Sequence, residues 1–203
     1  MQQTNYTYLA LGDSYTIGES VPAALNFPNQ VATFLRKEKK TFEAPTIIAT
    51  TGWATDELAA QLSRVRLKVP YTFVTLLIGV NNQYRGRLLS EYKKEFTALL
   101  EQAISYAGGK ANHVIVLSIP DWSVTPFAAD RDRITISKEI DAFNAANEAI
   151  SKQYKVHYIN ITAFTREAAT DRTLIADDGL HPSAKDYKRW AEKVKEVMMK
   201  ELR

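Results

Sequence analysis

Short apolar runs alternate with longer stretches of helical periodicity along the chain. Five runs, at residues 6–11, 46–50, 72–78, 113–119 and 156–161, are almost continuously apolar instead of alternating with polar residues. Strands that are buried on both faces of a parallel sheet have this composition. The runs therefore predict five parallel strands that are covered by helices on both faces.

Amphipathic helices are predicted between these strands. Residues 88–107 place apolar side chains at steps of three and four, and Gly108 follows as a stop signal. Ser137 is the expected N-cap of the next long helix, and the last helix is expected to begin near Ser183. Strands alternating with helices predict right-handed crossovers and an α/β fold. We expect a flavodoxin-like three-layer α/β/α sandwich, formed as one domain by residues 1–203.

Composition limits the classes of function. The 203 residues carry 26 Lys and Arg against 23 Asp and Glu, a net charge of +3 that does not favour a nucleic-acid partner. Three histidines and no cysteine offer poor material for a metal site, so neither a metal nor another cofactor is expected. No run approaches the roughly 18 apolar residues of a membrane span. We expect no integral membrane segment and a cytoplasmic location, whereas the oligomeric state cannot be predicted.

Residues suited to catalysis follow the predicted strands. Ser14 follows the first run in "GDSY", Gly52 the second in "TTGWAT" and Asn81 the third in "GVNN". In a doubly wound sheet, ligands bind outside the carboxyl ends of the strands, where these residues are expected to lie. Each of them is also an ordinary turn residue, so none identifies a site by itself.

The segment "DDGLHP" before the last helix is more specific. Asp178 precedes His181 by three residues, with Gly179 between them to allow a sharp turn. A carboxylate in that position can accept a hydrogen bond from Nδ1 of the histidine and leave Nε2 free to take a proton. Pro182 favours an extended backbone at His181 and so keeps it outside the helix. The segment predicts an oriented general base.

Together, four blocks resemble the SGNH hydrolases, also called the GDSL esterases and lipases. Ser14, Gly52, Asn81 and His181 stand in the family's order and span nearly the whole chain. The resemblance implies the SGNH hydrolase fold and a serine esterase. The G-x-S-x-G signature of the α/β-hydrolases is absent, because "GDSYT" lacks the second glycine.

The resemblance also implies a role for each residue. Ser14 would be the nucleophile that forms an acyl-enzyme, His181 the general base and then acid, and Asp178 the group that orients the histidine. The implied oxyanion hole consists of the backbone N–H groups of Ser14 and Gly52 and the side-chain amide of Asn81. No cofactor takes part.

Two neighbours of these residues raise separate questions. Asp13 is the obvious second catalytic acid, but we expect it to brace the nucleophile loop through hydrogen bonds. Asn82 replaces an acid that many relatives have after the block asparagine. We expect this replacement to change local hydrogen bonding without displacing Asn81 from its role.

The expected substrate is a small carboxylic ester with a short acyl or acetyl group, because no insertion long enough for a lipase lid is visible. Residues after the third and fourth strands are candidates for the pocket walls: Tyr84, Arg85, Trp122, Pro126 and Phe127. A thioesterase, a lysophospholipase or a carbohydrate acetyl esterase of the same family is the alternative. A non-catalytic flavodoxin-like module that binds an anion is a more distant one, and it leaves Asp178 and His181 unexplained.

Overall fold

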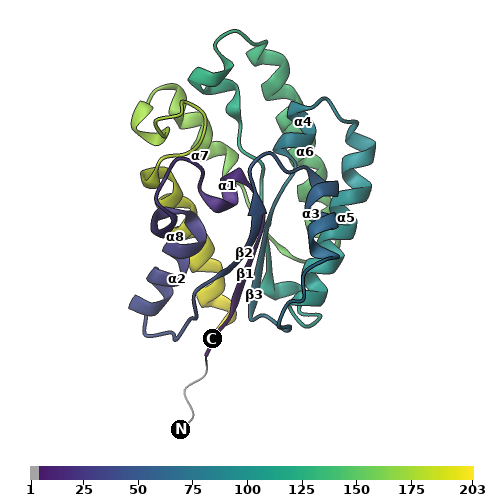
Figure 1. Ribbon diagram of the computed structural model, residues 1–203, viewed down its shortest axis with the longest axis vertical. Helices are drawn as coiled ribbons and strands as arrows, with labels where there is room; N and C mark the ends of the chain where they lie inside the picture. Colours follow the sequence, from purple (N-terminus) through teal and green to yellow (C-terminus); the bar gives the residue numbers. More distant parts are fainter. Residues whose placement is uncertain (1–4) are drawn as a thin grey trace.

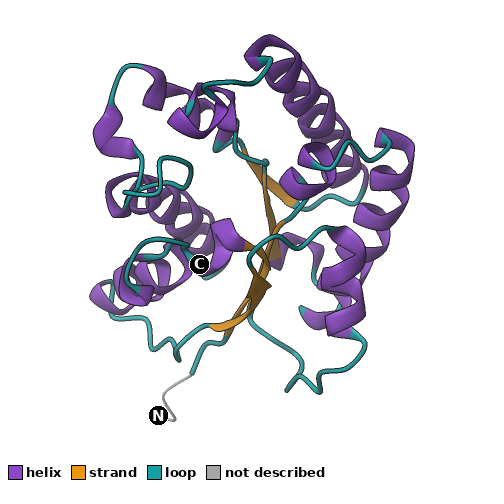
Figure 2. Cartoon of the chain, turned by 45° about the horizontal axis from the view of Figure 1, so that its top comes forward, coloured by secondary structure: helices purple, strands orange, loops and turns teal. Residues whose placement is uncertain are grey.

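A computed structural model describes residues 5–203 of the chain (Figure 1). Five parallel strands form one sheet in the order β2-β1-β3-β4-β5, as predicted from the apolar runs. Figure 2 shows the sheet edge-on between its covering helices. The strands are β1 (Tyr8–Asp13), β2 (Thr46–Thr50), β3 (Phe73–Leu77), β4 (Val114–Leu117) and β5 (His157–Ile159).

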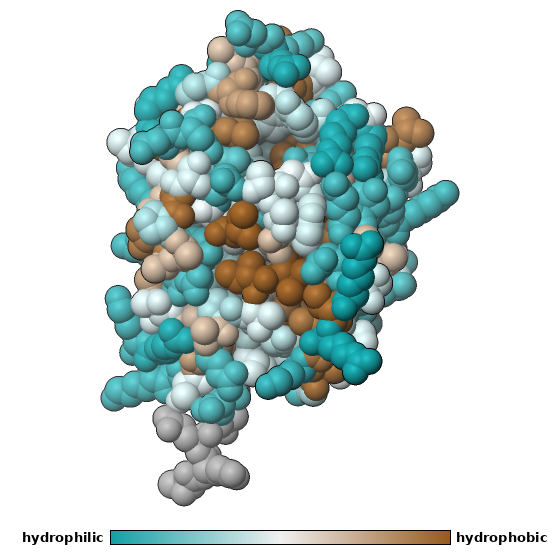
Figure 3. Space-filling model, in the orientation of Figure 1, coloured by the Kyte–Doolittle hydropathy of each residue, from teal (hydrophilic) through white to brown (hydrophobic). Residues whose placement is uncertain are grey.

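Burial explains why the central strands are continuously apolar. All residues of β1, β3 and β4 are buried, whereas β2, at one edge, is only half-buried. Leu11 of β1 lies between Ile48 of β2 and Leu76 of β3 in the register. Figure 3 shows apolar side chains gathered in the lower centre of the face seen in Figure 1, with polar and charged side chains around them.

Helices cover both faces of the sheet and complete the predicted three layers. The helices α2 and α8 pack together on one face, and α3, α5 and α6 cover the other (Figure 1). The α-helices are α1 (Ser14–Ile17), α2 (Phe27–Lys37), α3 (Thr55–Leu62), α4 (Val80–Tyr84), α5 (Leu89–Tyr106), α6 (Arg133–Gln153), α7 (Thr162–Arg166) and α8 (Ala184–Glu201). Single 3₁₀ turns are found at Ala23–Leu25, Ala111–His113, Trp122–Val124, Pro126–Ala128, Glu167–Ala169 and Arg172–Leu174.

The start of α6 differs from the prediction. The helix begins at Arg133, because the side chain of Asp132 accepts a hydrogen bond from the Thr135 N–H at 3.0 Å and acts as the N-cap. Ser137 therefore lies inside the helix, and its hydroxyl donates to the Asp121 carboxylate at 2.8 Å. The predicted cap was wrong because an equally good capping residue, Asp132, stands five residues earlier.

The order of the strands places the loops that matter for function. β1 lies between β2 and β3, so successive strands are added first on one side of β1 and then on the other. The carboxyl ends of neighbouring strands on either side of such a switch point border a crevice. Ser14 follows β1, and the loops after β2 and β3 flank it. Within residues 5–203, no helix is both long and apolar enough to cross a bilayer.

Candidate active site

Ser14 is the first residue of the one-turn helix α1, directly after β1. The Asp13 carboxylate caps this helix by accepting a hydrogen bond from the Tyr15 N–H at 3.0 Å. A Cβ atom on Gly12 would lie 2.1 Å from the Thr16 hydroxyl and 2.5 Å from the Leu77 carbonyl oxygen. Glycine at this position therefore allows the strand to turn into the helix without a spacer, which holds Ser14 at the end of the sheet.

Ser14, His181 and Asp178 form one chain of hydrogen bonds. Nε2 of His181 lies 2.9 Å from Oγ of Ser14, and Nδ1 lies 2.6 Å from Oδ2 of Asp178. Ser14 and His181 are 167 residues apart in the sequence. The imidazole is buried, and its ring packs 4.8 Å from the ring of Tyr15. This arrangement can transfer a proton from the serine hydroxyl to the histidine.

The acid loop holds Asp178 by its backbone. Oδ1 of Asp178 accepts hydrogen bonds from the N–H groups of Leu180 at 2.9 Å and His181 at 3.0 Å. The Ala176 N–H closes the loop by donating to the His181 carbonyl at 2.8 Å. Burial raises the pKa of Asp178, but hydrogen bonds from His181, Ser20 and two backbone N–H groups outweigh it and hold the pKa at about 2. Asp178 is therefore ionised and favours the tautomer that is protonated at Nδ1.

Asp13 lies next to Ser14 but has no hydrogen bond to His181. Its Oδ1 caps α1, and its Oδ2 has no hydrogen-bond partner among the described residues. Burial raises the pKa of Asp13 to about 7, against the lowering effect of the backbone N–H groups that it faces. Only one of its two oxygens thus supports the nucleophile loop in the expected way.

The loop after β2 is tied to the short helix α4. Nδ2 of Asn81 donates to the Trp53 carbonyl at 2.9 Å, and Nη2 of Arg85 donates to the Gly52 carbonyl at 2.6 Å. Gly52 has a φ of 83°, which favours glycine there. Arg85 was expected in the pocket wall, but its guanidinium holds this loop and also pairs with Glu57 at 2.9 Å. One N–H of the Asn81 amide remains for a further acceptor.

Asn82, at the position where the resemblance implies an acid, uses both ends of its amide. Oδ1 of Asn82 accepts from the Thr55 N–H at 3.1 Å, and Nδ2 donates to the Thr55 hydroxyl at 2.6 Å. That hydroxyl in turn donates to the Glu95 carboxylate. Asn82 is fully buried, so this network fixes the start of α3 beside Asn81. An acid at position 82 could not make the second of these bonds in its ionised form.

A cavity of about 140 Å³ opens beside Ser14 and His181. Aromatic rings form one wall: Trp122 lies 5.4 Å from Tyr84 and 5.9 Å from Phe127 between ring centroids. Trp122 is buried and donates from Nε1 to Oε1 of Gln83 at 2.8 Å. The lining residues are Ser14, Tyr15, Val80, Asn81, Tyr84, Trp122, Phe127, Leu180 and His181.

The three aromatic wall residues expected from the sequence therefore line the cavity, and so does Asn81. Gly52, Arg85 and Pro126 are absent from its lining. Tyr15, Val80 and Leu180 were not predicted from the sequence. Each is the direct neighbour of a predicted site residue in the sequence, and this was the only signal available for them.

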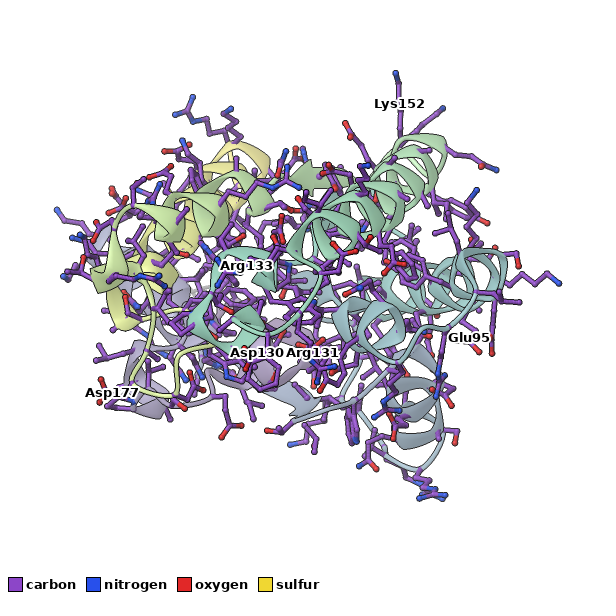
Figure 4. The ribbon with its side chains drawn as sticks, turned by 90° about the horizontal axis from the view of Figure 1, so that it is seen from above. Glu95, Asp130, Arg131, Arg133, Lys152 and Asp177 are labelled. Carbon is purple, nitrogen blue, oxygen red and sulfur yellow. The ribbon has the colours of Figure 1, made fainter. Side chains whose placement is uncertain are left out.

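Charged side chains are found at this end of the molecule (Figure 4) but not in the lining of the cavity. Figure 4 looks onto this end of the molecule and shows Asp130 and Arg131 side by side on the loop after β4, with Asp177 at the outer edge of the acid loop. The cavity lining itself contains no lysine, arginine, aspartate or glutamate. Among the described residues, no group of three or more His, Cys, Asp or Glu side chains could hold a metal ion.

Solved structures with this fold are esterases in several cases. TesA superposes with a TM-score of 0.73 at 18% identity, covering 95% of this chain and 97% of that one. The psychrotrophic esterase EstA from Pseudoalteromonas sp. gives 0.72 at 19% identity, with coverage of 97% and 98%. The acetylxylan esterase Axe2 from Geobacillus stearothermophilus gives 0.75 at 16% identity, with coverage of 98% and 96%. These likenesses establish the shared fold.

No curated protein sequence matches the chain. The sequence model of the GDSL-like lipases and acylhydrolases, however, matches residues 10–189, which include the serine, the glycine, the asparagine and the Asp-x-x-His segment at this end of the sheet. The chain therefore belongs to the GDSL-like lipase/acylhydrolase family and is an ester hydrolase.

Proposed function

We propose that the protein is a serine esterase that acts through Ser14, His181 and Asp178. The continuous hydrogen-bond chain from Ser14 Oγ to Asp178, with distances of 2.9 and 2.6 Å, carries this proposal. Ser14 Oγ attacks the acyl carbon of the ester while its proton passes to Nε2 of His181. Asp178 keeps the proton on Nδ1 and stabilises the imidazolium that forms.

The oxyanion of the tetrahedral intermediate accepts hydrogen bonds from the backbone N–H groups of Ser14 and Gly52 and from Nδ2 of Asn81. The Asn81 amide is held by its bond to the Trp53 carbonyl and keeps one N–H for this purpose. When the intermediate collapses, the alcohol leaves with the proton from His181 and the acyl group stays on Ser14. Water then attacks the acyl-enzyme by the same proton transfers and releases the acid.

The size and lining of the cavity support a short, uncharged acyl group as the part of the ester that the protein binds there. Its volume of about 140 Å³ is close to that of an engineered cavity of about 150 Å³ that binds benzene. An acyl chain of up to about six carbons, or an aryl group, is of that size. The aromatic wall of Tyr84, Trp122 and Phe127 offers apolar contact, and no charged side chain favours an ionic acyl group.

The experiment is a series of p-nitrophenyl esters from acetyl to dodecanoyl, assayed with the wild-type protein and Ser14→Ala. We expect kcat/KM to peak at six carbons or fewer and to fall for longer chains that exceed the cavity. Ser14→Ala should lose nearly all activity and remain folded, because the Ser14 hydroxyl bonds to no described residue other than His181. A Ser14→Ala variant with most of the wild-type activity would rule out this nucleophile.

A further inference from the structure

The turn that follows the nucleophile helix has a strained backbone. Ser20 has a φ of 64°, in the left-handed region that glycine favours. In the described part of the chain, only Lys39 and Lys155 share this feature among non-glycine residues. A side chain in this conformation costs free energy, and such residues cluster at functional sites. Ser20 plays no part in the proton transfers described above.

The Ser20 hydroxyl reaches the acid. Oγ of Ser20 donates to Oδ2 of Asp178 at 2.7 Å, across 158 residues of sequence. An ionised carboxylate can accept about four hydrogen bonds. The other three on Asp178 come from the ring of His181 and from two backbone N–H groups of its own loop. Among the residues that the structure describes, Ser20 thus supplies the one donor to Asp178 from outside the acid loop.

The turn itself is attached to the nucleophile. The N–H groups of Gly18 and Glu19 both donate to the Ser14 carbonyl at 3.0 Å. The Glu19 carboxylate accepts a hydrogen bond from the Thr51 hydroxyl, next to the loop that carries Gly52. The backbone before Ser20 is therefore held from two sides, and the Ser20 hydroxyl is directed from this anchored turn toward Asp178.

We propose that Ser20 is a positioning residue. It links Asp178 to the segment that carries the nucleophile and so keeps the side chains of Ser14, His181 and Asp178 aligned. This inference rests on the proposed function. Without Ser20, the acid loop keeps its internal bonds but loses its direct bond to the nucleophile turn. Oδ2 of Asp178, whose side chain is 28% exposed, would keep its bond from Nδ1 of His181 and accept from water in place of Ser20, and water does not tie the carboxylate to the nucleophile turn.

The test compares Ser20→Gly with Lys39→Gly. Glycine accepts the left-handed backbone at both positions, so neither substitution introduces backbone strain. Ser20→Gly should lower kcat about tenfold, the effect of one hydrogen bond to a charged group, with little change in KM. Lys39→Gly, at a φ of 60° and away from the catalytic loops, should leave both constants unchanged.

Two further measurements separate positioning from a general structural effect. The acidic limb of the kcat/KM profile should move to higher pH in Ser20→Gly, because a carboxylate with one donor fewer attracts the imidazolium more strongly. The other ionisable groups near the site are the same in both proteins: Tyr15, Asp121 and Asp186, which line a pocket together with His181, and Asp13, which precedes Ser14. The low-field proton resonance of Nδ1–H in the ligand-free protein should shift or broaden.

The resonance requires no substrate, so it tests Ser20 even if the wild type hydrolyses none of the esters, a result that would overturn only the proposed function. A Ser20→Gly variant with wild-type kcat, pH profile and resonance would overturn the positioning role. A fall in kcat with an unchanged acidic limb and resonance would overturn it as well.

Discussion

Replacing Asp13 by asparagine should change how the stability of the protein depends on pH. Asp13 is fully buried beside Ser14, with Oδ1 bound to the Tyr15 N–H and Oδ2 without a partner among the described residues. Asparagine keeps the shape and the acceptor for Tyr15, so the nucleophile helix stays capped. The variant removes one feature, the ionisable carboxyl group whose pKa burial raises to about 7.

The size of the effect follows from the two pKa values. Below pH 3.8 the carboxyl group is protonated in the folded and unfolded chains, and its ionisation contributes nothing to stability. Between pH 3.8 and 7 the unfolded chain ionises first, so the wild type loses stability as pH rises. Above pH 7 the loss is complete and amounts to about 4 kcal/mol. The Nδ2 group of asparagine takes the place of Oδ2 and is a buried donor without a hydrogen-bond partner. It therefore lowers the stability of the variant by about 1–3 kcal/mol at every pH.

Urea unfolding of the wild type and Asp13→Asn from pH 4 to pH 8 measures this difference. Between pH 4 and pH 8, the free energy of unfolding of the variant should rise by about 4 kcal/mol relative to that of the wild type. The pH-independent cost of the asparagine amide does not affect this change. Asp186, whose pKa burial raises to about 6, titrates in both proteins and cancels in the comparison. Parallel curves for the two proteins would refute the raised pKa of Asp13. Activity should remain within tenfold of the wild type if Asp13 only braces Ser14.

Two further substitutions test the loops around Ser14. Asn81→Ala should lower kcat by about 10²–10³ in the p-nitrophenyl ester assay, the cost of one oxyanion donor, and a loss below tenfold would exclude Asn81 from that role. Asn82→Asp should lower the free energy of unfolding by about 1–3 kcal/mol at pH 8, because an ionised carboxylate cannot donate to the Thr55 hydroxyl and lies near Glu95. That loss should shrink toward pH 4, where a protonated carboxyl group can donate, and a pH-independent loss in urea unfolding would contradict this explanation.

The sequence predicted the strands well because burial on both faces demands apolar residues at every position. Equally apolar strands carry no signal for which neighbour they pair with, so the strand order followed from the expected flavodoxin-like fold and not from the strands themselves. Helix ends were less certain for a related reason. Asp132 and Ser137 are both good N-caps, and the hydrogen bond from Ser137 to Asp121 depends on a contact made only in the folded chain.

Some residues of the site could be predicted from the sequence, whereas others depend on contacts that form only in the folded chain. Asp178 and His181 stand in a short pattern whose chemistry follows from their spacing, whereas the roles of Ser14, Gly52 and Asn81 followed from the resemblance of the four blocks to a family. Arg85 and Ser20 act through contacts with distant loops, and their direction could not be predicted. Its place after the third strand suggested that Arg85 lines the pocket, whereas the folded chain turns its guanidinium toward the Gly52 carbonyl. Serine in a turn is common, and only the folded chain reveals the φ of 64° at Ser20 and its hydrogen bond to Asp178.

The strand order explains why such distant contacts are needed. Gly52 and Asn81 follow β2 and β3, the two strands that border β1, so the sheet itself places them beside Ser14. Asp178 and His181 come from a loop that leaves β5 at the far edge of the sheet, and no strand pairing fixes that loop next to β1. α8 packs on α2, and this places the start of α8 on the same face of the sheet as α2. The position of His181, just before α8, is thereby set roughly. A hydrogen bond from the nucleophile turn to Asp178 then supplies the alignment that the sheet does not provide.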